Sequence, residues 1–123
     1  MTVLLVEDDP EQLAVRAMLL EHHGFEVVTA TTGKAALDLA RDTGPHCTVL
    51  DLRLPTVEIG LDTLRQLRQH HPGMRIFVLT GAPRHTPPVE EAARYADAVV
   101  SKGSGRLLQQ LEELRTGVRS ARA

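Results

Sequence analysis

The sequence is poor in aromatic residues and cysteine, and it has no long apolar run. It contains two Phe, one Tyr and no Trp, so its core must be aliphatic, and single-strand nucleic-acid binding by base stacking is not expected. The single Cys47 cannot form an internal disulfide, and no segment is apolar over the roughly 20 residues that a membrane-spanning helix needs. The net charge of −2 indicates neither a nucleic-acid surface nor an acidic tail. We therefore expect a cytoplasmic protein whose residues contact neither nucleic acid nor membrane.

The length and the absence of repeats indicate a single domain. A chain of 123 residues can bury a hydrophobic core without disulfides or a structural metal. We expect this domain to comprise residues 1–118, with residues 119–123 forming a basic tail or the start of a linker.

Short apolar runs alternate along the chain with longer amphipathic segments. Four of the five runs are nearly continuously apolar, which is typical of parallel strands covered on both faces. The run at 25–29 contains Glu26, so we place it at the edge of the sheet. The expected strands are residues 3–6, 25–29, 48–50, 76–79 and 98–100.

The segments between these runs carry helix signals. Asp9, Pro10 and Gln12 form a capping-box pattern with proline at the first helical position, and Gly24 is expected to end that helix in a left-handed conformation. Further helices are expected from the cap Thr32 to about residue 41, over 61–70, from Pro87 and Pro88 onward, and over 105–117, the last with Leu107, Leu111, Leu114 and Val118 on one face. Five βα units predict an α/β fold with a doubly wound, five-stranded parallel sheet and helices on both faces.

Polar residues follow the expected strands at the edge where such sheets bind ligands. Glu7, Asp8 and Asp9 follow the first strand, and the third, fourth and fifth are followed by Asp51, Thr80 and Lys102. We expect these side chains to converge.

This set suits a divalent cation and a phosphoryl group. Mg²⁺ binds one or two carboxylates and completes its octahedron with water, carbonyl and phosphate oxygens. A carboxylate can attack phosphorus to form an acyl phosphate, while Lys102 supplies positive charge and Thr80 a hydrogen bond. Without metal, at least one of these close carboxyl groups should have a raised pKa.

Four segments carry a resemblance that covers the whole chain. LLVEDDP, VLDLRLP, FVLTGA and VVSKG, in this order and spacing, resemble the receiver domain of two-component response regulators (the CheY-like superfamily). The resemblance implies a flavodoxin-like fold with strand order 2-1-3-4-5. It implies a phosphoacceptor rather than an enzyme, with slow self-dephosphorylation at most. The implied partners are a sensor histidine kinase or histidine phosphotransfer domain and a downstream protein or output domain; a homodimer is a further option.

The resemblance also implies a role for each site residue. Asp51 matches the phosphoacceptor, Thr80 the switch hydroxyl and Lys102 the lysine that contacts the phosphoryl group. For Mg²⁺, Asp8 and Asp51 match direct ligands, Glu7 matches a ligand acting through water, and Arg53 supplies its backbone carbonyl. The side chains of Arg53 and Ala82 occupy positions that influence the access of hydrolytic water, and we expect a moderately slow hydrolysis.

Simpler interpretations apply to several other residues. Asp9 is better explained as a helix cap than as a metal ligand. Cys47 is expected to pack as a small apolar residue. The pairs His22–His23 and His70–His71 lie at expected helix C-termini, where neighbouring side chains diverge too far to share a metal.

The sequence departs from the family pattern at four places. Val99 stands where receivers commonly have an aromatic residue, and Gly103 follows the lysine where proline is usual. The segment LPTVEIG makes the spacing from Asp51 to Gly60 one residue longer, and APRHTPP delays the fourth helix. We therefore expect complete phosphorylation chemistry with an unusual readout.

Two other functions remain open at this stage. A receiver-like module could bind partners without being phosphorylated, which the changes at Val99 and Gly103 would allow. A phosphatase of the haloacid dehalogenase type would also use Asp51 with Mg²⁺, but it needs a second Asp where this chain has Arg53.

Overall fold

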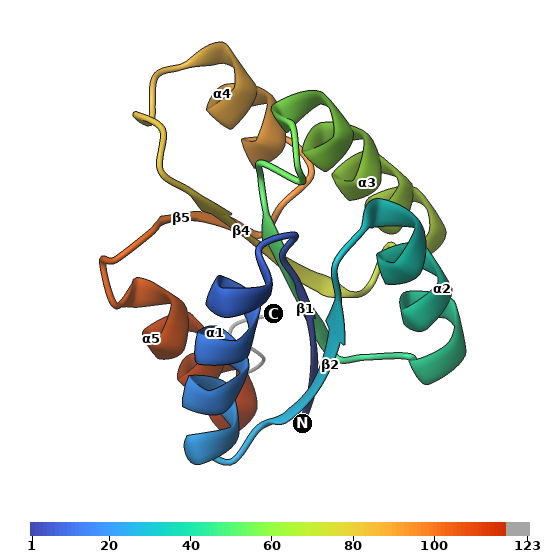
Figure 1. Cartoon of the computed structure of the whole chain (residues 1–123), viewed down its shortest axis with the longest axis vertical. Helices are drawn as coiled ribbons and strands as arrows, with labels where there is room; N and C mark the ends of the chain where they lie inside the picture. The colour runs from blue at the N-terminus through green and yellow to red at the C-terminus, as the bar shows by residue number, and fades with distance from the viewer. Residues whose placement is uncertain (118–123) are drawn as a thin grey trace.

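The chain folds into alternating strands and helices around one parallel sheet (Figure 1). The computed structural model describes residues 1–117. The sheet order is β2-β1-β3-β4-β5, and all four pairings are parallel, which confirms the predicted flavodoxin-like topology and the edge position of β2. The elements are β1 (Thr2–Val6), α1 (Pro10–His22), β2 (Glu26–Ala30), α2 (Gly33–Thr43), β3 (Cys47–Asp51), α3 (Val57–His70), β4 (Arg75–Thr80), α4 (Pro87–Ala93), β5 (Ala98–Ser101) and α5 (Arg106–Thr116).

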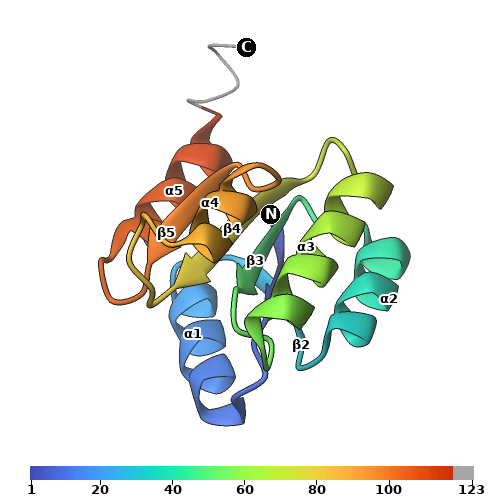
Figure 2. The same cartoon turned by 90° about the horizontal axis from the view of Figure 1, so that it is seen from above.

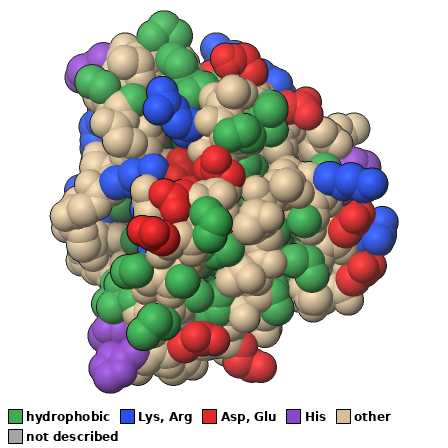
Figure 3. All heavy atoms as spheres, in the orientation of Figure 1, with side chains coloured by type: hydrophobic (Ala, Val, Ile, Leu, Met, Phe, Trp, Pro, Cys, Tyr) green, Lys and Arg blue, Asp and Glu red, His purple; other side chains and the backbone are tan. Residues whose placement is uncertain are grey.

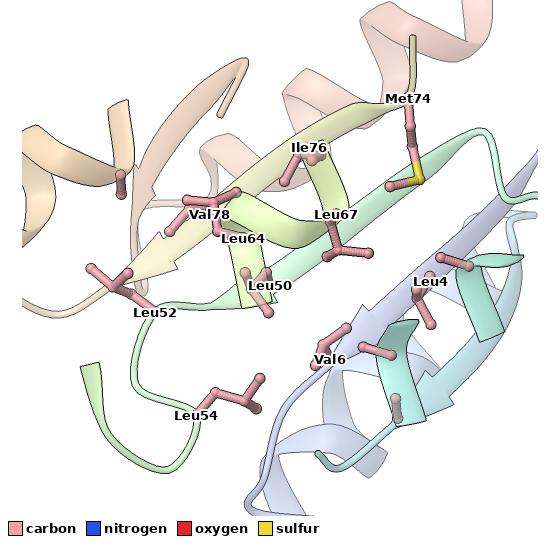
Figure 4. Packing of buried hydrophobic residues seen from close by; sticks show 14 of the residues in the cluster. Leu4, Val6, Leu50, Leu52, Leu54, Leu64, Leu67, Met74, Ile76 and Val78 are labelled. Carbon is pink, nitrogen blue, oxygen red and sulfur yellow. The ribbon is translucent and has the colours of Figure 1, made fainter. Parts of the chain in front are cut away.

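Helices cover both faces of the sheet, with α1 and α5 on one side and α2 and α3 on the other (Figure 2). The side chains of β1 alternate between two hydrophobic clusters because successive residues of a strand point to opposite faces. Val3 and Leu5 belong to the cluster that contains Leu20 of α1 and Leu111 of α5. The other cluster joins β1 to α2, α3 and α4, and Figure 4 labels Leu4, Val6, Leu50, Leu52, Leu54, Leu64, Leu67, Met74, Ile76 and Val78. The sheet is therefore buried on both faces, as the continuous apolar runs predicted.

The start of α1 confirms Asp9 as its cap but corrects the capping box. The Asp9 Oδ1 atom accepts hydrogen bonds from the backbone N–H groups of Glu11 and Gln12. The Gln12 side chain does not reach back to the Asp9 backbone; its amide donates to Asp9 Oδ2. The backbone N–H of Asp9 donates instead to Glu7 Oε2, at 3.1 Å. Gly24 follows the helix with φ +89°, as predicted.

Helix α3 begins at Val57, four residues before the predicted start at 61. Thr56 caps it, because its hydroxyl accepts the Ile59 N–H at 3.2 Å, and Glu58 adds a negative charge to the first turn. The threonine and glutamate were signals available in the sequence. The second half of LPTVEIG is therefore the first turn of a helix, whereas the sequence predicted no helix before residue 61.

Gly60 allows this early turn of α3 to lie against the end of β3. A Cβ atom at this position would lie 1.8 Å from the backbone oxygen of Leu52. The close approach therefore requires glycine, and it positions the first turn of α3 beside the chain that leaves Asp51.

The remaining helices largely follow the predictions. Thr32 caps α2, which extends to Thr43 rather than ending near 41. Helix α4 has only seven residues and carries Pro87 and Pro88 in its first turn. In α5, Leu107, Leu111 and Leu114 pack into the core, whereas Val118 and the predicted tail, 119–123, lie outside the described residues. No helix formed by residues 1–117 has the length and hydropathy to cross a bilayer.

We predict that Gly60→Ala destabilises the fold by about 2–3 kcal/mol, because the added methyl group meets backbone rather than a flexible side chain. Helix propensity alone would favour alanine by about 1 kcal/mol, so the sign of the change separates the two effects. Urea unfolding monitored by circular dichroism measures it.

Gly73→Ala is the matched control, because a Cβ atom at Gly73 would have no neighbour within 4 Å. It should change the free energy of unfolding by less than about 0.5 kcal/mol. A Gly60→Ala protein as stable as the parent would contradict the close contact with Leu52.

Candidate functional site

The register of the central strands brings the predicted site residues to one edge of the sheet. Val6 of β1 pairs with Leu50 of β3, so the residues that follow them, Glu7 and Asp51, leave the sheet side by side. On the other side of β3, Thr80 ends β4 and pairs with Ser101 of β5, which precedes Lys102. The backbone N–H of Lys102 donates to the Thr80 carbonyl at 2.9 Å, which extends this pairing.

Asp51 lies at the centre of the site and is 2% exposed. Its Oδ2 atom lies 2.7 Å from Lys102 Nζ, and Oδ1 accepts the backbone N–H of Arg53 at 2.9 Å. Burial and the neighbouring Glu7 carboxyl raise the pKa of Asp51, although the bonds from Lys102 and Arg53 oppose the shift. The expected raised pKa among the clustered carboxyl groups is thus found at Asp51.

Glu7 is also buried, and both of its carboxylate oxygens have protein donors. Arg16 Nη1 of α1 lies 2.5 Å from Glu7 Oε1, while Glu7 Oε2 accepts the Asp9 N–H. The side chains of Glu7 and Arg16 are 3% and 20% exposed, so water screens this ion pair only weakly. Glu7 is therefore held between Asp51 and helix α1.

Asp8 is half-exposed, and its carboxylate has no hydrogen-bond or ion-pair partner within residues 1–117. Glu7 pairs with Arg16 and Asp51 pairs with Lys102, so Asp8 is the one of these three carboxylates that has no cationic partner in the described part of the chain. The face seen in Figure 3 shows acidic side chains gathered near its middle, with basic side chains beside them.

The oxygen-only donor set fits a hard divalent cation. In the described part of the chain, no three His, Cys, Asp or Glu side chains form a cluster that could hold a metal ion by themselves. A cation bound here would need oxygens from backbone, water or a phosphoryl group as well, and that is the mixed coordination Mg²⁺ adopts.

A cavity of about 670 Å³ opens beside Asp51 and reaches the start of α4. Thr80, which is 5% exposed, lines the cavity, and its hydroxyl accepts the Ala82 N–H at 3.0 Å. The cavity is lined by Asp51, Leu52, Arg53, Val57, Thr80, Gly81, Ala82, Thr86, Pro87, Pro88 and Lys102. An acidic oxygen, a hydroxyl and an ammonium therefore face one space that is open to a ligand.

Two residues near the end of β5 depart from the pattern of the resembled family, and the structure shows the conformation of each. Gly103 adopts φ +78° and Gly105 φ +76°, so the loop after Lys102 turns through left-handed glycines. Val99 is half-buried against the core and lines a separate cavity of about 300 Å³ beside α4. A small aliphatic side chain thus occupies the position where an aromatic ring is common in the resembled family.

The cysteine and the two histidine pairs named in the sequence analysis lie apart from this site. Cys47 is fully buried, and burial raises the pKa of its thiol. His22 and His23 end α1, and His70 and His71 end α3.

Arg16 is the site residue that the sequence analysis missed. Asp9, Gln12 and Arg16 are spaced by three and four residues along α1, which places them on one side of the helix. That spacing was a signal that Arg16 lies on the same side of α1 as its cap, although tertiary packing decides that it meets Glu7.

Comparison with known proteins identifies relatives of this chain. It is 33% identical over 102 residues to the cell cycle transcriptional regulator CtrA of Caulobacter vibrioides, a match that covers 83% of this chain and 44% of that protein. The chain spans a third to a half of the length of the curated relatives it matches.

Solved structures share the fold over nearly the whole chain. The receiver domain protein from Methanospirillum hungatei superposes with a TM-score of 0.82 at 26% identity, covering 91% of this chain and 90% of that one. A Burkholderia pseudomallei response regulator, solved with a phosphorylated aspartic acid, a calcium ion and citrate, gives a TM-score of 0.80 at 26% identity over 99% of this chain and 72% of that one. The profile of the response regulator receiver domain matches residues 3–113, and the chain belongs to this family.

Proposed function

We propose that Asp51 accepts a phosphoryl group from a histidine kinase or a histidine phosphotransfer domain. The observation that carries this proposal is the placement of a buried carboxylate between Lys102 and Glu7, at the edge of a cavity that Thr80 also lines. The similar Burkholderia protein contains a phosphorylated aspartic acid. The receiver family is not a family of enzymes, which removes the phosphatase interpretation.

The proposed reaction is a single displacement at phosphorus, in which the phosphoryl group moves from the donor to Asp51. An Asp51 oxygen attacks, the bond from phosphorus to the donor nitrogen or oxygen breaks, and the donor leaves with that electron pair. Lys102 would exchange its present contact with Asp51 for one with a phosphoryl oxygen. Thr80 would turn its hydroxyl from the Ala82 N–H toward the same group and so report its arrival.

The residues present fit Mg²⁺ as the cofactor. Asp8 and Asp51 would supply carboxylate oxygens, Arg53 its backbone carbonyl, and Glu7 would act through water. When bound, Mg²⁺ neutralises the charge that builds up on the phosphoryl oxygens. The Asp8 carboxylate, which has no protein partner among residues 1–117, and the raised pKa of Asp51 support this assignment.

An exposed apolar surface on α1 suits a protein donor. Val15, Met18 and Leu19 are 67%, 69% and 48% exposed, and Figure 3 shows hydrophobic side chains gathered over this helix. They lie on the helix that begins next to Glu7 and Asp8, so a partner docked on α1 would reach Asp51. Such exposed apolar groups commonly mark interaction surfaces.

The output of the domain is a separate part of the proposal. We infer that residues 1–118 form a receiver that signals in the cytoplasm to a downstream protein or to an output domain, as the name of the regulator CtrA suggests for that longer protein. Val99 and Gly103 keep one alternative open, a module that binds partners without phosphorylation. The phosphorylation experiment separates the two.

Incubation with a small phosphodonor such as acetyl phosphate and Mg²⁺ should add one phosphoryl group, visible by intact-protein mass spectrometry. Hydroxylamine should remove it, because an acyl phosphate is cleaved by this nucleophile. Asp51→Asn should abolish the adduct, since the amide cannot act as the nucleophile.

Asp62→Asn is the matched control, because Asp62 is an exposed carboxylate of α3 that hydrogen-bonds only Gln66 among the described residues. It should be labelled like the parent. Absence of an adduct in the parent, with the small donor and with a histidine kinase alike, would favour the phosphorylation-independent module.

Arg53→Ala should shorten the lifetime of the phosphoryl group by several-fold. The Arg53 side chain lines the cavity beside Asp51, where a long cationic side chain can shield an acyl phosphate from water or bind its oxygens. The decay of the adduct after removal of the donor measures the effect. An unchanged decay rate would show that Arg53 contributes only its backbone to the site.

A further inference from the structure

The side chain of Arg16 closes a ring of hydrogen bonds around Glu7. Arg16 Nη1 binds Glu7 Oε1 at 2.5 Å, and Arg16 Nη2 donates to Gln12 Oε1 at 3.1 Å. The Gln12 amide donates to Asp9 Oδ2 at 3.3 Å, and the Asp9 N–H returns to Glu7 Oε2. Each member of the ring is oriented by its neighbours, so the guanidinium is fixed beside the site.

Because this ring holds Arg16 against Glu7, Arg16 changes the electrostatic potential at the metal site as well as stabilising the start of helix α1. Glu7 contacts the guanidinium on one side and lies beside Asp51 on the other. A cation paired with Glu7 reduces the negative potential that attracts a second cation to the same carboxylates. Burial of the pair increases the effect, because little water separates the charges.

We infer that Arg16 is a positioning residue. Its guanidinium holds a positive charge against the Glu7 carboxylate and thereby keeps the affinity of the site for the divalent cation low. The inference rests on the proposed function, since it concerns the metal site of that proposal. In the metal-free protein, the positive charge of Arg16 balances the negative charge of Glu7. When the metal binds, the two cations compete for this carboxylate, so part of the binding free energy is lost.

Removal of the Arg16 charge should therefore tighten metal binding. Even at a water-like dielectric, one unit charge separated from a divalent cation by a bridging carboxylate changes affinity by roughly tenfold. We expect Arg16→Met, which keeps an apolar stem of similar length, to bind Mn²⁺ and Mg²⁺ about tenfold more tightly than the parent.

The measurement is a titration with Mn²⁺ in which the electron paramagnetic resonance signal of the free ion reports binding, with Mg²⁺ as competitor. Arg41→Met is the matched control, because it removes the same charge from a side chain that is 68% exposed and that pairs, within residues 1–117, only with Asp38 and Asp42 of its own helix. Arg16→Lys keeps the charge. Both should stay within about threefold of the parent.

The titration distinguishes failure of this inference from failure of the proposed function. Unchanged or weaker binding by Arg16→Met, with normal binding by the parent, would overturn this inference and leave the proposed function intact. A parent that binds neither ion would contradict the metal site of the proposed function, and this inference with it. If circular dichroism shows that Arg16→Met does not fold, the same titration with Arg16→Gln decides.

Discussion

The site depends above all on the parallel pairing of β1 with β3. Because Val6 pairs with Leu50, Glu7 and Asp51 emerge next to each other from a sheet that is buried on both faces. Two carboxylates so close and so poorly hydrated are unfavourable unless cations or shared protons balance them. The surrounding residues meet this need: Lys102 binds Asp51, Arg16 binds Glu7, and the pKa of Asp51 is raised. The apolar packing that fixes the register therefore brings together the carboxylates that the proposed chemistry uses.

The polar groups of this edge are held by short-range contacts that a phosphoryl group would have to rearrange. Lys102 is bound to Asp51, and the Thr80 hydroxyl accepts the Ala82 N–H. Thr80 ends β4 and Lys102 follows β5, and the cavity that both residues line reaches the start of α4. There the chain has a seven-residue helix and the small Val99 rather than a large ring. In the proposed function, the chemistry and the readout therefore involve different residues, and the departures at Val99 and α4 lie on the side of the readout.

The continuous apolar runs predicted a parallel sheet buried on both faces, whereas the strand order 2-1-3-4-5 came from the resemblance to receiver domains. The sequence also predicted the Asp9 cap, the left-handed Gly24 and the late start of α4, each of which depends on a local rule. The start of α3 was missed because Thr56 and Glu58 form a weaker signal than the glycine that follows them. Arg16 was missed for another reason: its role depends on how α1 is oriented relative to Glu7, and tertiary packing decides that orientation. The residues that follow the strands at this edge were therefore predictable, whereas the partner that a helix supplies to Glu7 was not.

Asp51, together with a divalent cation, is proposed to form a site for a phosphoryl group. Fluoroberyllate, a mimic of an acyl phosphate, tests it without any donor protein, because its fluorine signals shift when the complex binds a carboxylate. We predict bound ¹⁹F resonances in the parent that require Mg²⁺ and are absent from Asp51→Asn. Resonances that persist in Asp51→Asn, or a parent that gives none with Mg²⁺ in excess, would contradict this account.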